Sequence, residues 1–155
     1  MPLCEASDGG SVSAAVQGPR EISLLFCDVV CKEFSGIVYH ANYLRFIERG
    51  RTNHLRLMGA EQHALFAETE TETPGYAFVV RAMTLDFLKP ARMDDVLEIV
   101  TWPVAVRGAS IVLAQEVRRD AAVLVKAAVR VACISEGRAE RIPQSLRTLM
   151  KADIA

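Results

Sequence analysis

The sequence predicts an α+β domain in which a largely antiparallel sheet curls around one long helix. Three observations lead to this class: a strand-like run from residue 21, a long helical period over residues 38–58, and four β-rich segments over residues 76–135. Short connections separate the four segments, and strands joined by short hairpins pair antiparallel. One long apolar helix is the natural partner for one face of such a sheet.

The first strand follows a leader of different composition. Residues 1–20 are rich in Gly, Ser and Ala and lack a sustained apolar period, so we expect a flexible N-terminal leader. From Glu21 the chain reads EISLLFCDVV, which is typical of a β-strand. A single domain is therefore expected over residues 21–151.

The helix is predicted because apolar residues recur three and four apart over residues 38–58. Gly50 in its interior costs ~1 kcal/mol relative to alanine, which indicates close packing at that point. Gly59 suits the position after a helix end, and a further short helix is expected over residues 61–69. The predicted buried row consists of Tyr43, Phe46, Ile47, Gly50, His54 and Leu57.

The second half of the chain is predicted to form a four-stranded meander. Pro90 and Pro103 are expected to end its first two strands, because proline cannot donate to a sheet ladder. The last strand is long and apolar on both faces, as a central strand is. The expected strands are Tyr76–Leu88, Val96–Trp102, Ala109–Arg118 and Ala122–Ser135. Alternation along the first strand assigns one face to Val79, Met83, Leu85 and Phe87 and the other to Phe78, Val80, Ala82 and Leu88.

Composition excludes several classes of protein. The 155 residues include 18 Lys plus Arg and 19 Asp plus Glu, which leaves a net charge of −1. Nucleic acids and anionic membranes select a clustered basic excess, so neither is an expected partner. No apolar run approaches the ~18 residues that a membrane span needs. The four cysteines lack paired C-x-x-C spacing and the density of a secreted disulfide scaffold, so a reducing, cytoplasmic location is expected.

Familiar catalytic motifs are missing from the sequence. There is no glycine-rich phosphate loop, no H-E-x-x-H and no G-x-S-x-G. His40, His54 and His63 are spaced 14 and 9 residues apart, which matches no metal-ligand pattern. We therefore expect neither a metal site nor an organic cofactor.

A candidate site remains where the first strand leads into the helix. Glu33 precedes the turn at Ser35 and Gly36, and the helix begins around Tyr39 and His40. The first amides of a helix lack intrahelical acceptors and carry the positive end of its dipole, so they can bind a developing oxyanion. A carboxylate beside such amides is the minimum equipment for hydrolysing an activated acyl group. The alternative is that Glu33 is an exposed turn residue that only complements the dipole.

Two segments of the sequence resemble a known family. They are GIVYHANYLRFIERGRT at residues 36–52 and FVVRAMTLDFLKPARMDD at residues 78–95. Both are similar to hotdog-fold acyl-CoA thioesterases of the 4-hydroxybenzoyl-CoA thioesterase type, most of all to the bacterial branch associated with the Tol-Pal system. The similarity extends from Leu25 to Pro143. It implies a hotdog fold, in which an antiparallel five-stranded sheet curls around one long central helix.

The resemblance also implies site residues. In the family an Asp lies seven residues ahead of the histidine, and the corresponding position here is Glu33. The extra methylene moves the carboxylate, so either Glu33 works, as general base or nucleophile, or the activity is weakened. Asp28 is the alternative acid if the loop register differs. The amides near Tyr39 and His40 would polarise the thioester carbonyl, and Asn42 matches the family pattern at the substrate.

The coenzyme A part of the substrate is expected to lie between subunits, as it does in the family. Arg107, ahead of Gly108 and Ser110, matches the family's basic-Gly-x-Ser segment and would bind a phosphate of the acyl-CoA. The alternative is a solvated arginine in a turn. The resemblance implies a homodimer or homotetramer with sites at the subunit boundaries.

The sequence thus predicts an acyl-CoA thioesterase that releases a carboxylic acid and CoA without a cofactor. One alternative is a thioesterase acting on acyl-carrier protein. Another is a non-catalytic hotdog protein that binds acyl-CoA and in which Glu33 marks a decayed site.

Overall fold

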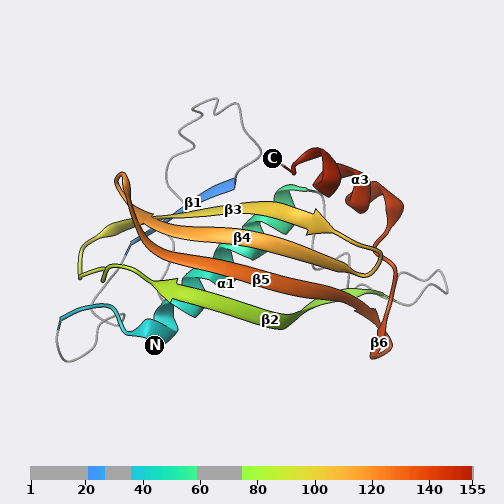
Figure 1. The fold of residues 1–155 in the computed structure, drawn as a ribbon, viewed down its shortest axis with the longest axis horizontal. Helices are drawn as coiled ribbons and strands as arrows, with labels where there is room; N and C mark the ends of the chain where they lie inside the picture. Colours follow the sequence, from blue (N-terminus) through green and yellow to red (C-terminus); the bar gives the residue numbers. More distant parts are fainter. Residues whose placement is uncertain (1–20, 27–35, 59–74, 155) are drawn as a thin grey trace.

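The described part of the chain forms one sheet, a long helix behind it and a short C-terminal helix (Figure 1). The computed structural model describes residues 21–26, 36–58 and 75–154, so the predicted leader and the predicted helix at 61–69 lie outside the described residues. The predicted α+β class is confirmed. No described helix has the length and apolar character needed to cross a membrane. The elements are β1 (Glu21–Phe26), α1 (His40–Leu57), β2 (Ala77–Phe87), β3 (Val96–Val106), β4 (Ser110–Arg119), β5 (Ala122–Ser135), β6 (Arg138–Ala139) and α3 (Gln144–Ala152).

The sheet is antiparallel throughout, but its strand order is not that of a simple meander. The order is β1-β3-β4-β5-β2, with β6 beside β5. The hairpins from β3 to β5 are as predicted, whereas β2 pairs with β5 at the far edge and not with β3. Crossing the two intervening strands takes about 14 Å at ~4.8 Å per strand. The connection over residues 88–95 can span up to ~26 Å, so a short link does not require a hairpin.

A bulge changes which residues of β2 face the core. The register of its pairing with β5 shifts at Arg81, which is the extra residue of the bulge. Phe78 packs on the core before the bulge, and Met83 and Leu85 pack on it after the bulge. The predicted alternation is therefore wrong for Phe78. Phe87 does share the face of Met83 and Leu85, as predicted: its ring lies 5.7 Å from that of the buried Tyr43, although it is 53% exposed at the end of the strand.

Pro103 does not end β3, contrary to the prediction. The strand continues to Val106, and its register with β4 shifts between Pro103 and Ala105. On its other side, the described residues of β1 pair with β3 from Val96 to Thr101. Proline is tolerated at bulges, and the register shift next to Pro103 marks one.

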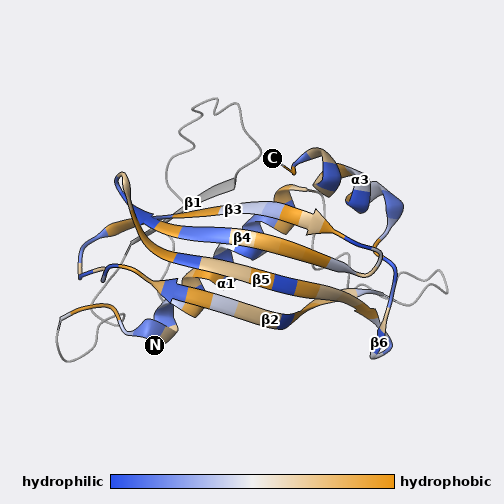
Figure 2. Ribbon diagram, viewed as in Figure 1, coloured by the Kyte–Doolittle hydropathy of each residue, from blue (hydrophilic) through white to orange (hydrophobic). Residues whose placement is uncertain are grey.

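The central strand and the long helix supply half of the described hydrophobic core. β5 lies between β4 and β2, as predicted for a central strand, and it is hydrophobic along most of its length (Figure 2). α1 begins two residues later than predicted and packs against β1, β3 and β4. Leu57, predicted on the buried face, is 68% exposed at the helix end. The buried helix residues are Tyr43, Phe46, Ile47, Gly50, Arg51, His54 and Leu55.

Gly50 lies where α1 approaches the sheet closely. A Cβ atom at this position would lie 2.5 Å from Cγ2 of Ile99, 3.2 Å from Oγ1 of Thr101 and 3.3 Å from Nε2 of Gln115. Real Cβ contacts are not made at 2.5 Å, so only glycine fits without a shift of the sheet or helix. The predicted close packing at Gly50 is confirmed.

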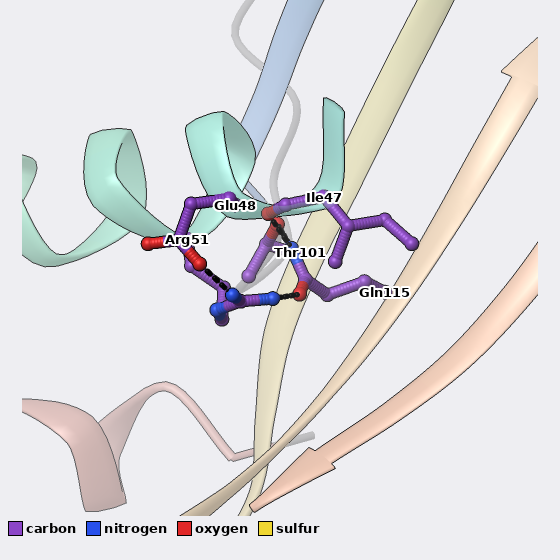
Figure 3. Close-up of polar contacts among 5 residues, drawn as sticks. All are labelled: Ile47, Glu48, Arg51, Thr101 and Gln115. Atoms are coloured by element: carbon purple, nitrogen blue, oxygen red, sulfur yellow. Dashed lines mark hydrogen bonds and ion pairs between the residues drawn. The ribbon is translucent and has the colours of Figure 1, made fainter. Parts of the chain in front are cut away.

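A buried polar cluster surrounds this contact (Figure 3). The Gln115 side-chain amide donates to the carbonyl of Ile47 and to Oγ1 of Thr101, both at 2.9 Å. Nη1 of Arg51 donates to Oε1 of Gln115 at 3.0 Å, and Nη2 pairs with Glu48. Burial lowers the pKa of Arg51 to about 10, so its guanidinium is still charged at neutral pH. Every polar atom of the Gln115 amide is thereby satisfied, as a buried amide requires.

The C-terminal helix α3 was missed by the sequence analysis. It follows Pro143 and buries Leu146 and Met150, four residues apart on one face. Nε2 of the buried His54 on α1 lies 3.7 Å from Oδ2 of Asp153 at the end of α3. Burial lowers the pKa of His54 and raises that of Asp153, so both neutral forms are favoured there. The sequence signal for α3 is one pair of apolar residues within nine positions, and so short a pattern does not distinguish a helix from a loop.

Replacing Gly50 by alanine is expected to destabilise the protein. Alanine improves helix propensity by ~1 kcal/mol. The new methyl group would overlap Ile99, which is β-branched and 1% exposed, and such overpacking costs about 1–3 kcal/mol. Urea unfolding should therefore show Gly50→Ala to be less stable than the wild type by about 1 kcal/mol. Gly108→Ala is the control, since a Cβ there meets nothing within 4 Å; equal stability of Gly50→Ala and the wild type would contradict the packing argument.

Candidate active site

The N-cap residue of α1 does not cap the helix with its own side chain. Tyr39 occupies the N-cap position with φ −60° and ψ 132°, makes no side-chain capping bond, and no acidic residue lies in the first turn. Asn42 N–H donates to the carbonyl of Tyr39 at 2.9 Å, which tightens the turn. The positive end of the helix dipole is therefore not neutralised by side chains of this turn. Gly36 precedes it with φ 80°, a left-handed conformation, which confirms the sharp turn predicted at this glycine.

The loop between β2 and β3 holds the helix start in place. Ile37 forms an antiparallel bridge with Arg92. Val38 N–H donates to the carbonyl of Ala91 at 2.9 Å, and Ala91 N–H donates to Oη of Tyr43 at 2.8 Å. Residues on both sides of the first helical turn are thus attached to one residue of the loop.

A carboxylate fixes the far end of the same loop. Oδ2 of Asp95 accepts from Arg92 N–H at 2.7 Å and from Nη1 of Arg119 at 2.7 Å. Partial burial alone would raise the pKa of Asp95, but these two donors outweigh it and hold that pKa below its ordinary value of 3.8. Asp94 adopts φ 68°, which gives the turn its shape. Hydrogen bonds to Asp95 therefore fix the shape of the segment PARMDD at residues 90–95, and this segment holds the helix start.

Aromatic side chains line the helix start. The ring of His40 lies 4.4 Å from that of Tyr39 and 6.4 Å from that of Phe87, and Tyr43 lies 5.7 Å from Phe87. Phe87 is 53% and Tyr39 43% exposed, so apolar surface is available beside the helix amides. An acyl chain could pack against this surface while its carbonyl faces the helix start.

The structure brings together only part of the predicted site. Tyr39, His40 and Asn42 all belong to the start of α1, and the rings of Tyr39 and His40 lie 4.4 Å apart. Glu33 and Asp28 lie outside the described residues, so the predicted carboxylate is not placed. The turn over residues 107–110 lies at the other end of β3, and an 11-residue strand is roughly 35 Å long. Within one chain the helix start and the predicted phosphate-binding turn are therefore far apart (Figure 1).

Backbone hydrogen bonds hold the turn over residues 107–110. Arg107 N–H donates to the carbonyl of Ser110 at 2.8 Å, and the carbonyl of Gly108 accepts from Ile142 N–H at 2.9 Å. Cys133 N–H donates to the carbonyl of Ala109 at 2.8 Å. The exposed Arg107 is thus presented to solvent from a fixed turn.

Ala91, Asp95 and Phe87 were not identified as site residues from the sequence. The segment that contains them matched the family, but nothing in its pattern assigns it to the helix start across about 50 residues. In the part of the chain that the structure describes, no three His, Cys, Asp or Glu side chains gather as a metal site would need.

An antiparallel sheet packed on one long helix, with the start of that helix attached to the loop between β2 and β3, matches the hotdog class of thioesterases. The chain belongs to the Thioesterase superfamily, whose family model matches residues 35–126. The acyl-CoA thioesterase YbgC of Haemophilus influenzae is 40% identical over 103 residues, which cover 66% of this chain and 72% of that protein. The acyl-CoA thioester hydrolase YbgC of Escherichia coli O6:H1 is 45% identical over 100 residues, which cover 64% of this chain and 70% of that protein.

Solved structures agree with this assignment. A probable thioesterase from Bartonella henselae is 36% identical and has a TM-score of 0.75, covering 80% of this chain and 99% of that one. The gentisyl-coenzyme A thioesterase BH1999 is 18% identical with a TM-score of 0.74, covering 84% and 99%, and shares the fold. The predicted hotdog fold and the predicted family are confirmed.

Replacing Asp95 by asparagine is expected to destabilise the protein in a pH-dependent way. Because folding depresses the pKa of Asp95, its carboxylate contributes stability above pH 3.8, and this contribution is lost as the pH falls through the lower folded value. In urea unfolding, Asp95→Asn should be less stable than the wild type at pH 7, and the difference should shrink at pH 3. Asp94→Asn is the matched control, because it removes a neighbouring charge and leaves the Arg119 contact intact. A difference that is constant with pH would contradict the prediction.

Proposed function

We propose that the protein hydrolyses acyl-CoA thioesters to a carboxylic acid and CoA at the N-terminus of α1. The observation that carries the proposal is the start of α1 in a member of the Thioesterase superfamily. Its first turn holds no acidic residue, Tyr39 does not cap it, and two hydrogen bonds attach it to Ala91. The names of the curated relatives, which are acyl-CoA thioesterases, support this substrate class.

The proposed reaction uses the helix start and one carboxylate. The thioester carbonyl oxygen accepts hydrogen bonds from the amides near Tyr39 and His40, which stabilise the negative charge that develops on it. Glu33 takes a proton from water as the water attacks the carbonyl carbon, and the tetrahedral intermediate collapses to the carboxylic acid. Alternatively, the Glu33 carboxylate attacks that carbon itself, and water later hydrolyses the mixed anhydride so formed, which releases the acid and restores Glu33. In both routes the carbon–sulfur bond breaks, and the thiolate of CoA leaves and is protonated. Asn42, in the same turn, faces the bound acyl group in this proposal, and no metal or organic cofactor takes part.

The decisive experiment measures free thiol released from a panel of short, long and aromatic acyl-CoAs. The wild type should release CoA from at least one member, whereas Glu33→Gln should lose turnover by about a hundredfold or more and keep the fold, as judged by circular dichroism. Asp28→Asn is the matched control and should keep turnover. No release from any member of the panel would remove the proposed function. Loss in Asp28→Asn instead would assign the carboxylate to Asp28.

We further propose a homodimer that completes each site with residues of two chains. β2 pairs with β5 on one side, and no described strand covers its other edge. The end of β2 lies beside His40, because the ring of Phe87 at that end is 6.4 Å from the His40 ring. The start of β2 pairs with β5 next to the turn over residues 107–110. Antiparallel pairing of two β2 strands about a two-fold axis would set the turn of one chain beside the helix start of the other. Arg107, Gly108 and Ser110 would then meet the CoA phosphates of the partner's site.

Hybrid dimers test the shared site. In a dimer of one Glu33→Gln chain and one Arg107→Ala chain, one site carries both changes and the other carries neither. Such hybrids, purified through two different tags, should regain about half the wild-type rate per dimer, because one of two sites is intact. A hybrid no more active than its two parents would place both residues in one chain's site. A light-scattering mass of 17.0 kDa, that of one chain, would exclude the dimer itself.

The proposed location is the cytoplasm. The spacing of the four cysteines does not indicate disulfides. Cys133 is free and buried in the core, and burial raises the pKa of its thiol. A buried thiol of this kind behaves as a small hydrophobic residue.

A further inference from the structure

We propose that the hydroxyl of Tyr43 is a positioning group for the oxyanion site at the start of α1. The inference rests on the proposed function. It gives a role at the site to Tyr43, which the sequence predicts only as a buried residue of the helix. Tyr43 does not touch the substrate in this proposal. It acts through Ala91 on the backbone that carries the helix amides.

The hydrogen bonds around Ala91 form a closed arrangement. Val38 N–H donates to the carbonyl of Ala91, and Ala91 N–H donates to the hydroxyl of Tyr43. Val38 lies just before the helix, and Tyr43 lies one turn into it. Residues 39–42 are thus held between two attachment points on one loop residue. Because Ala91 is fully buried, water cannot replace either bond.

The hydroxyl of Tyr43 is separable from the packing of its ring. The ring lies 5.8 Å from that of Phe46 and 5.7 Å from that of Phe87, both edge to face. Tyr43 is 3% exposed, so its ring belongs to the core. A phenylalanine would keep both ring contacts and lose the hydrogen bond from Ala91. The substitution therefore tests the attachment without emptying the core.

Loosening this attachment should affect the transition state more than the bound substrate. Oxyanion donors act where charge develops, so their misplacement lowers kcat and leaves ground-state binding nearly unchanged. Small displacements of reacting groups have large effects on rate, up to about a hundredfold for 1 Å. A purely structural role for the hydroxyl would lower thermal stability and leave kcat of the folded enzyme unchanged.

The test compares Tyr43→Phe with the wild type on butyryl-CoA and benzoyl-CoA. We expect kcat to fall by about ten- to a hundredfold while KM changes by less than about threefold. Thr148→Val is the control: it removes an exposed hydroxyl that donates to the carbonyl of Gln144 at 2.9 Å on α3, and its kcat should equal that of the wild type. All three proteins are first shown to be folded by thermal denaturation. If Tyr43→Phe does not fold, Asp95→Asn loosens the same loop from its other end and should lower kcat in the same sense.

The outcomes separate this inference from the proposed function. An active wild type whose kcat is unchanged in Tyr43→Phe would overturn the positioning role alone. So would an equal loss in Thr148→Val, or a rise in KM at constant kcat. A wild type that hydrolyses neither these two substrates nor any other acyl-CoA would overturn the proposed function and this role with it.

Discussion

The close approach of α1 to the sheet at Gly50 is the constraint on which the rest of the structure depends. A helix carrying a side chain at this position would stand away from Ile99, and its whole buried face would separate from β3 and β4. Gly50 sets the distance between helix and sheet, but it does not set how the helix is rotated or how far it is shifted along the sheet. Gln115 adds these, because its two amide hydrogens bond to Ile47 on the helix and to Thr101 on the sheet. Hydrogen bonds are directional, so the buried amide fixes how α1 can slide or rotate.

The middle and the start of α1 are fixed by different means. At the middle, apolar packing and the Gln115 cluster hold the helix to β3 and β4. At the start, backbone hydrogen bonds to Ala91 hold it to the loop, and Asp95 with Arg119 shapes that loop. An oxyanion site must be arranged before the reaction begins, since donors that move during the reaction lose much of their effect. Two separate attachments along one rigid helix would meet this requirement at the proposed site.

The sequence predicts the local features of this fold better than its long-range ones. The helix over 40–57, the strands and the turn at Gly36 follow from periodicity and from glycine chemistry, which act over a few residues. The place of β2 at the far edge, the bulge at Arg81 and the continuation through Pro103 depend on which strands become neighbours, and no local pattern encodes that. For the same reason the helix start was predicted as a site, whereas the support from Ala91 was not. The hydrogen bond between residues 43 and 91 joins two segments, and nothing in the sequence of either segment indicates that it contacts the other.

The charge of the chain limits how a thioester of CoA could be attracted. CoA is a polyanion, and a net charge of −1 gives no long-range attraction toward it. Attraction must then come from local positive potential, and two sources of it belong to the proposed site. One is the dipole of α1, which no acidic residue of its first turn offsets. The other is the guanidinium of Arg107 on its fixed turn. Because these sources lie at opposite ends of β3, a single chain cannot place both against one substrate, whereas two chains related by a two-fold axis can.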